Sequence, residues 1–213
     1  MRLVMEKFKT IKENVTQDIE EKRSKFIANA YYVENVDEAE KIIKMVKKQY
    51  YDANHNCYAY IVKANQVVKR FSDDGEPNGT AGSPILNVLE KNKLYNVLII
   101  VTRYFGGILL GTGGLIRAYT EAALKVVEKS NIVEQEIGYE VKVTINYQDI
   151  DKFRYFCNKN NIKIVNMVYN EYVECIVEMT DEEKSNILNG NKYDERSINI
   201  IKFEIINEKF IRK

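Results

Sequence analysis

The sequence predicts an α+β protein with two domains, residues 1–134 and 135–213. Strands and helices alternate along the whole chain, and after Glu134 their order is strand, helix, strand, strand, helix, strand. That βαββαβ order is typical of a ferredoxin-like domain. Eight of the ten glycines, and both prolines, lie between Phe71 and Gly114. This concentration of glycine marks one unusual loop region in the first domain.

Apolar periodicity predicts the elements of the first domain. The expected strands cover 11–20, 25–33, 55–62, 67–71 and 97–102, and the expected helices cover 37–50, 83–93 and about 114–130. Asp37 is a candidate N-cap or first-turn acid, and Ser83 is expected to cap a helix that has Pro84 in its first turn. The run from 97 to 102 is continuously apolar, which predicts a strand buried on both faces.

The second domain follows a boundary near 133–137. Its expected strands are 137–146, 162–169, 172–178 and 197–206, with helices at 149–160 and 181–189. This stretch has no glycine-rich loop of its own. Its length and element order therefore predict a small supporting sandwich rather than a second loop site.

Composition narrows the function classes. The net charge of +1 makes no case for a whole-protein nucleic-acid binder, so a nucleic-acid surface has to be a local patch. Three cysteines without a C-x-x-C pair and one histidine are too few for a structural zinc site. The longest apolar run is too short to cross a bilayer, and the start lacks an apolar leader. We expect a cytoplasmic protein without cofactor or membrane contact.

The first glycine loop carries three carboxylates in four positions, Asp73, Asp74 and Glu76. Carboxylates this close are suited to a hard cation or to acid/base chemistry. The alternative is a polar turn in which Asp74 and Gly75 form the bend. No metal ligand set or catalytic residue is assigned, and an EF-hand is excluded because its ligands spread over twelve residues.

The second loop resembles a phosphate cradle but lacks its key residues. A P-loop needs a lysine where Thr112 stands, and a dinucleotide fingerprint needs a glycine where Ile116 stands. Free amides at a helix start can still bind a phosphate or carboxylate. The candidate binding residues of this loop are Gly106, Gly107, Gly111, Thr112, Gly113 and Gly114.

Arg103, Tyr104 and Phe105 lie between the apolar strand and this loop. Arg103 is a candidate bidentate partner for an anion, or else it pairs internally with one of the three carboxylates. Arginine beside aromatic residues is typical of a surface that binds single-stranded nucleic acid. We expect the ring of one of the two aromatic residues to be exposed and the other to be buried.

His55 is a candidate acid/base group or a structural histidine, and it shares a strand face with Cys57.

Taken together, these motifs resemble the Impact/YigZ family. The carrying residues are His55, Cys57 and Ala59-Tyr60, then Ser72-Asp73-Asp74-Gly75-Glu76-Pro77, Gly79-Thr80-Ala81-Gly82 and the run from Arg103 to Leu115. The resemblance implies an N-terminal Impact domain similar to the second domain of ribosomal protein S-five and to the fourth domain of elongation factor G. It implies a C-terminal domain similar to domain V of that factor, which is ferredoxin-like.

Three functions remain open. The leading hypothesis is a non-enzymatic, translation-associated regulatory factor that binds RNA, the ribosome or a ribosome-bound protein, without sequence-specific DNA binding. In that reading Arg103 contacts phosphate and the three carboxylates order the loops. The alternatives are a metal-assisted hydrolase of a small phosphorylated or carboxylated metabolite, which would use the carboxylates and His55, and a pure protein-interaction module.

Overall fold

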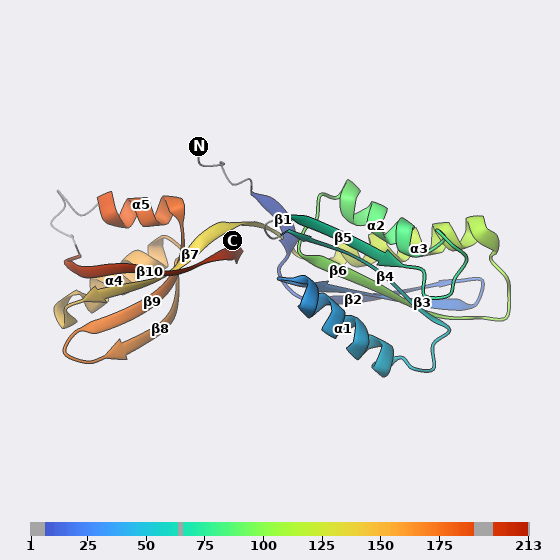
Figure 1. The fold of residues 1–213 in the computed structure, drawn as a ribbon, viewed down its shortest axis with the longest axis horizontal. Helices are drawn as coiled ribbons and strands as arrows, with labels where there is room; N and C mark the ends of the chain where they lie inside the picture. The colour runs from blue at the N-terminus through green and yellow to red at the C-terminus, as the bar shows by residue number, and fades with distance from the viewer. Residues whose placement is uncertain (1–6, 64–65, 190–197, 213) are drawn as a thin grey trace. The chain divides into compact units, whose positions relative to one another are not determined.

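The computed structural model describes residues 7–63, 66–189 and 198–212, and it divides into two compact units (Figure 1). One unit comprises residues 8–134, and the other comprises 135–213 together with the first seven residues. The described chain is an α+β protein with two antiparallel sheets. No described helix is both long and apolar enough to span a membrane.

The first unit is built on the antiparallel sheet β2-β3-β6-β4-β5. Its elements are β1 (Phe8–Ile11), β2 (Val15–Glu21), β3 (Ser24–Tyr32), α1 (Val36–Gln49), β4 (His55–Lys63), β5 (Val67–Ser72), α2 (Gly82–Lys91), β6 (Val97–Tyr104) and α3 (Gly111–Lys129). The expected first strand is therefore two strands, β1 and β2, because the chain turns between residues 12 and 14.

Helices cover both faces of this sheet. Figure 1 shows α1 on one face and α2 with α3 on the other. The central strand β6 alternates between two hydrophobic cores: Ile99 packs toward α2 and α3, and Leu98 packs toward α1. This arrangement confirms the predicted burial of β6 on both faces, which a strand between two helical layers requires. Each face of the sheet is thereby closed, and the open surface lies at the strand ends.

In the second unit, antiparallel strands pair in the order β10-β7-β9-β8. Its elements are β7 (Ile132–Ile145), the 3₁₀ turn η1 (Tyr147–Asp149), α4 (Ile150–Lys159), β8 (Lys163–Tyr169), β9 (Val173–Thr180), α5 (Asp181–Asn189) and β10 (Ile200–Arg212). Strand β10 continues past the expected end at 206, and the expected start at 197 lies outside the described residues.

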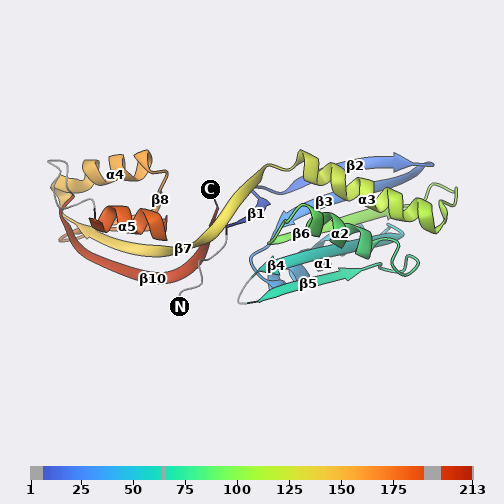
Figure 2. The ribbon, with the colours of Figure 1, turned by 90° about the horizontal axis from the view of Figure 1, so that it is seen from above.

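Both helices of the second unit lie on the same face of its sheet (Figure 2). Phe153 and Cys157 of α4 and Ile187 of α5 share one core with Val141 and Cys175 of the sheet. The opposite face carries charged pairs, among them Lys142 with Glu174. One closed face and one charged face are the usual arrangement of an antiparallel sheet covered on a single side.

Candidate functional site

The two glycine loops of the first unit enclose one pocket of about 510 Å³. The pocket collects six of the residues proposed from the sequence, which come from the β4 start, the β6 end, the two loops and the α3 start. Its lining comprises Asn54, His55, Gly75, Glu76, Pro77, Arg103, Phe105, Leu109, Leu110, Gly111, Thr112 and Leu115. The volume is in the range of small-ligand sites.

A buried ion pair joins the two loops. The Nη1 of Arg103, at the end of β6, donates to Oε1 of Glu76 at 2.7 Å, and both side chains are more than nine-tenths buried. Tyr119 of α3 donates its hydroxyl to the same oxygen at 2.8 Å. Of the alternatives open at the sequence level, internal pairing of Arg103 is therefore the one found, with Glu76 as its partner. Breaking such a pair leaves an uncompensated buried charge.

Aromatic rings hold the guanidinium from two sides. The Cζ atom of Arg103 lies 5.5 Å from the ring centre of Phe26 and 5.6 Å from that of Phe105. Its Nη2 lies 3.4 Å from Oγ of Ser24, while Nε has no partner among the described residues. These contacts fix the plane of the guanidinium. Arg103 thus holds the wall of the pocket.

Asp73 organises the first loop. Its carboxylate accepts hydrogen bonds from the amides of Gly79, Ala81 and Gly82 at 2.8–3.0 Å. These amides lead into α2, which begins at Gly82 and has no side-chain cap from its own N-cap residue. The expected cap at Ser83 is wrong, because Asp73 supplies the carboxylate from nine positions earlier. A carboxylate at this helix end is also favoured by the helix dipole.

Asp74 has a separate set of partners. It pairs with Lys47 of α1 and accepts from the amide of Asn56 at 2.7 Å. Its carbonyl oxygen lies 2.9 Å from Nδ1 of His55, whose Nε2 lies 3.9 Å from Glu76. The three carboxylates therefore serve three different contacts. Within the described ranges, no group of three His, Cys, Asp or Glu side chains forms a candidate metal site.

Cys57 lies behind this network as a buried thiol. Its Sγ donates to the carbonyl of Asp73 at 3.0 Å and lies 3.4 Å from the hydroxyl of Tyr119. Burial raises the pKa of Cys57 to about 12, and burial likewise raises the pKa of Tyr119. Because the thiolate is the reactive form of cysteine, Cys57 is a packing residue at neutral pH.

The two aromatic residues after Arg103 differ from the expectation of one exposed and one buried ring. Phe105 is exposed and donates its amide to Asn54, while Tyr104 is half-buried and donates its hydroxyl to Asp52 at 2.8 Å. The expected buried ring is therefore not found, because Tyr104 lies at the last position of β6, beyond the cover of the helices.

The glycines of the second loop have different reasons to be glycine. A Cβ on Gly106 would lie 2.0–2.4 Å from the backbone of Arg23 and Ser24, so no side chain fits there. A Cβ on Gly113 would meet only the flexible end of Arg117, at 3.7 Å. Of the other loop glycines, Gly107 and Gly111 have positive φ, and Gly114 packs against Leu110.

Helix α3 begins at Gly111, three residues before the expected start. Its N-cap residue, Leu110, makes no side-chain cap hydrogen bond, and Gly111 and Thr112 line the pocket. The first-turn amides of a helix carry partial positive charge and have no intrahelical acceptor. The pocket thus has a polar end at α3 and an apolar wall made by Leu109, Leu110 and Leu115.

Sequence reasoning did not assign Asn54, Leu109, Leu110 or Tyr119 to the site. Tyr119 belongs to the apolar stripe of α3, so its pattern indicated only core. The pair Leu109-Leu110 lies inside a glycine loop, and two adjacent leucines in a loop were the available signal. Leu109 is 84% exposed, while Leu110 is nearly buried.

Comparison with known proteins identifies the family. Residues 22–127 match the Impact N-terminal domain. The chain is 34% identical over 208 residues to the IMPACT family member YvyE of Bacillus subtilis, covering 91% of this chain and 96% of that protein. The chain belongs to the IMPACT family.

A second relative and a solved structure extend this likeness. YigZ of Escherichia coli is 32% identical over 161 residues, which cover 75% of this chain and 79% of YigZ. A crystal structure described as a hypothetical protein superposes with a TM-score of 0.63 at 28% identity, over 92% of this chain and 97% of that one. The matched domain contains both glycine loops, so the pocket lies in the part that defines the family.

Proposed function

We propose that this IMPACT family member is a non-enzymatic, translation-associated binding factor of the cytoplasm, and that its pocket receives an apolar segment of a ribosome-bound protein. The pocket is the meeting point of the two loops that carry the family motif. Its ionisable groups are occupied by internal contacts, and its accessible wall and rim are apolar.

The observation that carries the proposal is the contrast between wall and rim. Glu76 and Arg103 neutralise each other inside the wall at 2.7 Å. Phe105 and Leu109, which line the pocket, are exposed, and so is Ile108 of the same loop. Adjacent exposed apolar side chains beside a pocket are typical of a protein-recognition surface. The uncapped first turn of α3 supplies amides for one carbonyl or carboxylate of the bound segment.

The arrangement of the second unit supports the translation-associated part of the proposal. Its β-α-β-β-α-β order, with the first and third strands at the centre of an antiparallel sheet, agrees with a ferredoxin-like domain. We propose that this unit corresponds to domain V of elongation factor G, and the first unit to its fourth domain. A chain with both would be suited to the same ribosomal surroundings.

The geometry supports the hydrolase alternative less well than the binding factor. It needs a carboxylate and His55 to face one open point, whereas Asp73 accepts from three amides and Asp74 pairs with Lys47. Glu76 is the carboxylate nearest to His55, and its Oε1 is held by Arg103 and Tyr119. A carboxylate with these partners is a structural acceptor rather than a general base.

Co-sedimentation with ribosomes tests the proposal. We expect the full chain to sediment with unwashed ribosomes at low salt and to bind more weakly when the ribosomes are first salt-washed, because washing removes bound proteins. Leu109→Asp should strongly reduce sedimentation with unwashed ribosomes, since it places a charge at the apolar rim.

Val67→Asp is the matched control, because Val67 is an exposed apolar residue on β5 away from the pocket. It should sediment like the original chain. Folded chain that stays in the supernatant with unwashed ribosomes at low salt would refute the proposed function.

A further inference from the structure

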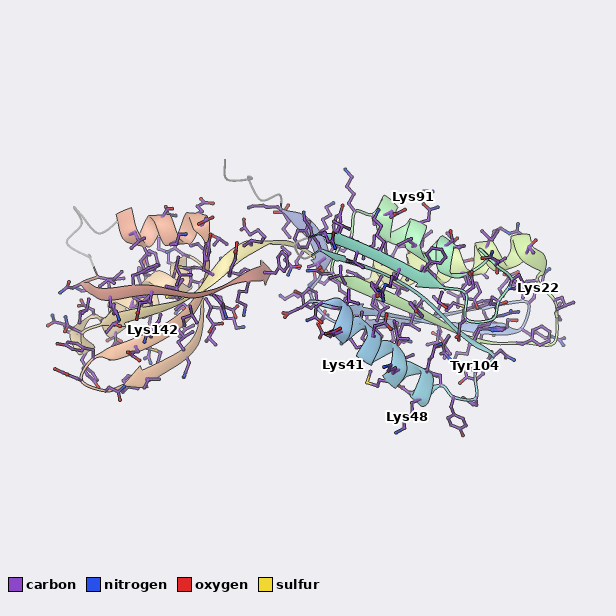
Figure 3. All side chains as sticks on the ribbon, in the orientation of Figure 1. Lys22, Lys41, Lys48, Lys91, Tyr104 and Lys142 are labelled. Carbon is purple, nitrogen blue, oxygen red and sulfur yellow. The ribbon has the colours of Figure 1, made fainter. Side chains whose placement is uncertain are left out.

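A stripe of lysines crosses the outer face of α1, away from the pocket. Lys41, Lys44 and Lys48 are exposed, and they form no ion pair with any residue that the structure describes. Their spacing of three and four positions places them on one helix face, over about 10 Å of helix. Figure 3 shows Lys41 and Lys48 on this helix. We call these three residues the lysine stripe.

The segment that carries the lysine stripe contains no carboxylate. Residues 41–51 include no Asp or Glu. Of the nearest acids, Glu40 accepts from Tyr60 and lies 3.5 Å from Arg70, and Asp52 accepts from Tyr104. Asp37 lies one helical turn before Lys41 in α1. Asp74, which faces α1 from the first glycine loop, pairs with Lys47, the one lysine of the helix outside the stripe. The lysine stripe is therefore a local positive patch on a chain of net charge +1.

Helix stability explains only part of this pattern. Cations in the last turn of a helix interact favourably with its dipole, which accounts for Lys47 and Lys48. The dipole effect is confined to the last turn, so it gives no reason for Lys41 and Lys44. Asp37 and Glu40 stand four positions before these two lysines, but neither acid forms an ion pair with them within the described part of the chain. Helix α3 provides the contrast, because its exposed face mixes signs and Lys125 pairs with Glu128 at 3.0 Å.

Two large side chains are exposed beside the lysine stripe. Tyr51, just after α1, is 84% exposed, and Met45 is 52% exposed. An exposed ring next to unpaired cations matches the two needs of a single nucleic-acid strand: cations for phosphates and a ring for a base. An anionic membrane fits less well, because the apolar face of α1, with Ala39, Ile43 and Val46, is already buried against the sheet.

We infer that α1 is a contact surface for single-stranded RNA, with the lysine stripe binding phosphates and Tyr51 stacking on a base. The inference deepens the proposed function and rests on it, because a translation-associated factor acts where RNA is exposed. It assigns the pocket and α1 to different partners: a protein segment and an RNA strand.

The test is binding of a labelled oligouridylate of about twelve nucleotides to the full chain, measured by fluorescence anisotropy between about 50 and 200 mM salt. Each phosphate contact on a single strand contributes about 0.7 to the slope of log K against log salt. Lys41→Gln, Lys44→Gln and Lys48→Gln combined should lower that slope by about 2 and the affinity roughly 100-fold at about 0.1 M salt. Tyr51→Ala should lower the affinity about tenfold with the slope unchanged.

The matched control replaces three other exposed lysines of the same unit, Lys9, Lys22 and Lys91, by glutamine. It removes the same charge and should keep most of the affinity. Equal losses in the stripe variant and the control would overturn the inference, because they would show that only net charge matters. Failure of the folded chain to bind the oligonucleotide at low salt would also overturn the inference. So would a result in which these lysines bind an acidic protein and the chain binds no RNA.

The two proposals can fail separately. Oligonucleotide binding uses purified chain and should be unaffected by Leu109→Asp, whereas sedimentation with unwashed ribosomes depends on Leu109. Stripe-dependent RNA binding without ribosome sedimentation would retain the RNA surface and refute the proposed function. Ribosome sedimentation in which the stripe variant matches the original chain at every salt concentration would retain the proposed function and refute the RNA surface.

Discussion

The pocket and the outer face of α1 use charge in opposite ways. Around the pocket, Arg103, Glu76 and Asp73 make short contacts within the unit and are held in place by them. On α1 the three lysines of the stripe are exposed, and they form no ion pair with any described residue. Buried charges need partners because desolvation is costly, whereas exposed ones do not. The comparison teaches that the charged residues of the family motif hold the loops, and that charges outside the motif are the ones free to bind.

Removing one partner of the buried pair should have the largest effect. Arg103→Met leaves Glu76 buried without its cation, so we expect the free energy of unfolding to fall by about 3–5 kcal/mol. Urea unfolding of the full chain measures this change. A variant as stable as the original chain would show that Arg103 is not a structural residue and would return it to the list of anion ligands.

The glycine loops offer a matched pair of substitutions. Gly106→Ala places a methyl group within 2.4 Å of the backbone of Arg23 and Ser24, and we expect a loss of about 1–3 kcal/mol. Gly113→Ala meets only the end of Arg117 and should raise stability by roughly 0.5–1 kcal/mol, since alanine is the better helix residue.

Thermal unfolding of the two glycine variants should therefore shift in opposite directions. If Gly113→Ala keeps its stability but loses partner binding, close approach to that backbone is part of recognition. A destabilised Gly113→Ala would contradict the structure of the α3 start.

A charge network in the second unit should give an intermediate, pH-dependent effect. Burial raises the pKa of Glu178, but hydrogen bonds and charge from Lys209 and Lys163 outweigh it and hold that pKa below its usual 4.5. A lowered folded pKa stabilises the protein above pH 4.5, and this stabilisation is lost as the pH falls through the folded value. Glu178→Gln should make unfolding less sensitive to acid in that range. Identical pH profiles of the two chains would contradict this role.

The smallest effect on stability is expected from the lysine stripe. Glutamine at all three positions should change the free energy of unfolding by no more than about 0.5 kcal/mol, as is usual for surface substitutions. A loss of more than about 2 kcal/mol would mean that the lysines support the fold, and the contrast with Arg103 would disappear.

Much of the fold was predictable from apolar periodicity, because burial on defined faces leaves a strong pattern. Helix α1 was expected at 37–50 and found at Val36–Gln49, and the buried strand β6 was expected at 97–102 and found at Val97–Tyr104. The start of α3 was missed by three residues. Glycine is a poor helix former, so Gly111, Gly113 and Gly114 did not define the first residue of the helix, and tertiary packing decided the boundary.

The candidate site was predictable in its location but not in its pairing. The cluster of glycines indicated where the loops meet. With Asp73, Asp74 and Glu76 in four positions, however, the choice of Glu76 as the partner of Arg103 depends on loop geometry that spacing does not reveal. The capping of α2 by Asp73 is non-local for the same reason. The apolar wall was missed because nothing in the sequence distinguishes Leu109 and Leu110 from ordinary hydrophobic residues until their loop is folded.

The most direct test of the central claim, that the motif charges act inward, is a double-mutant cycle on Arg103 and Glu76. Unfolding free energies are needed for Arg103→Met, Glu76→Met and the double variant. We predict a coupling energy of about 2–3 kcal/mol, with the double variant more stable than the sum of the single losses implies. Single losses that add to within about 0.5 kcal/mol would contradict the claim.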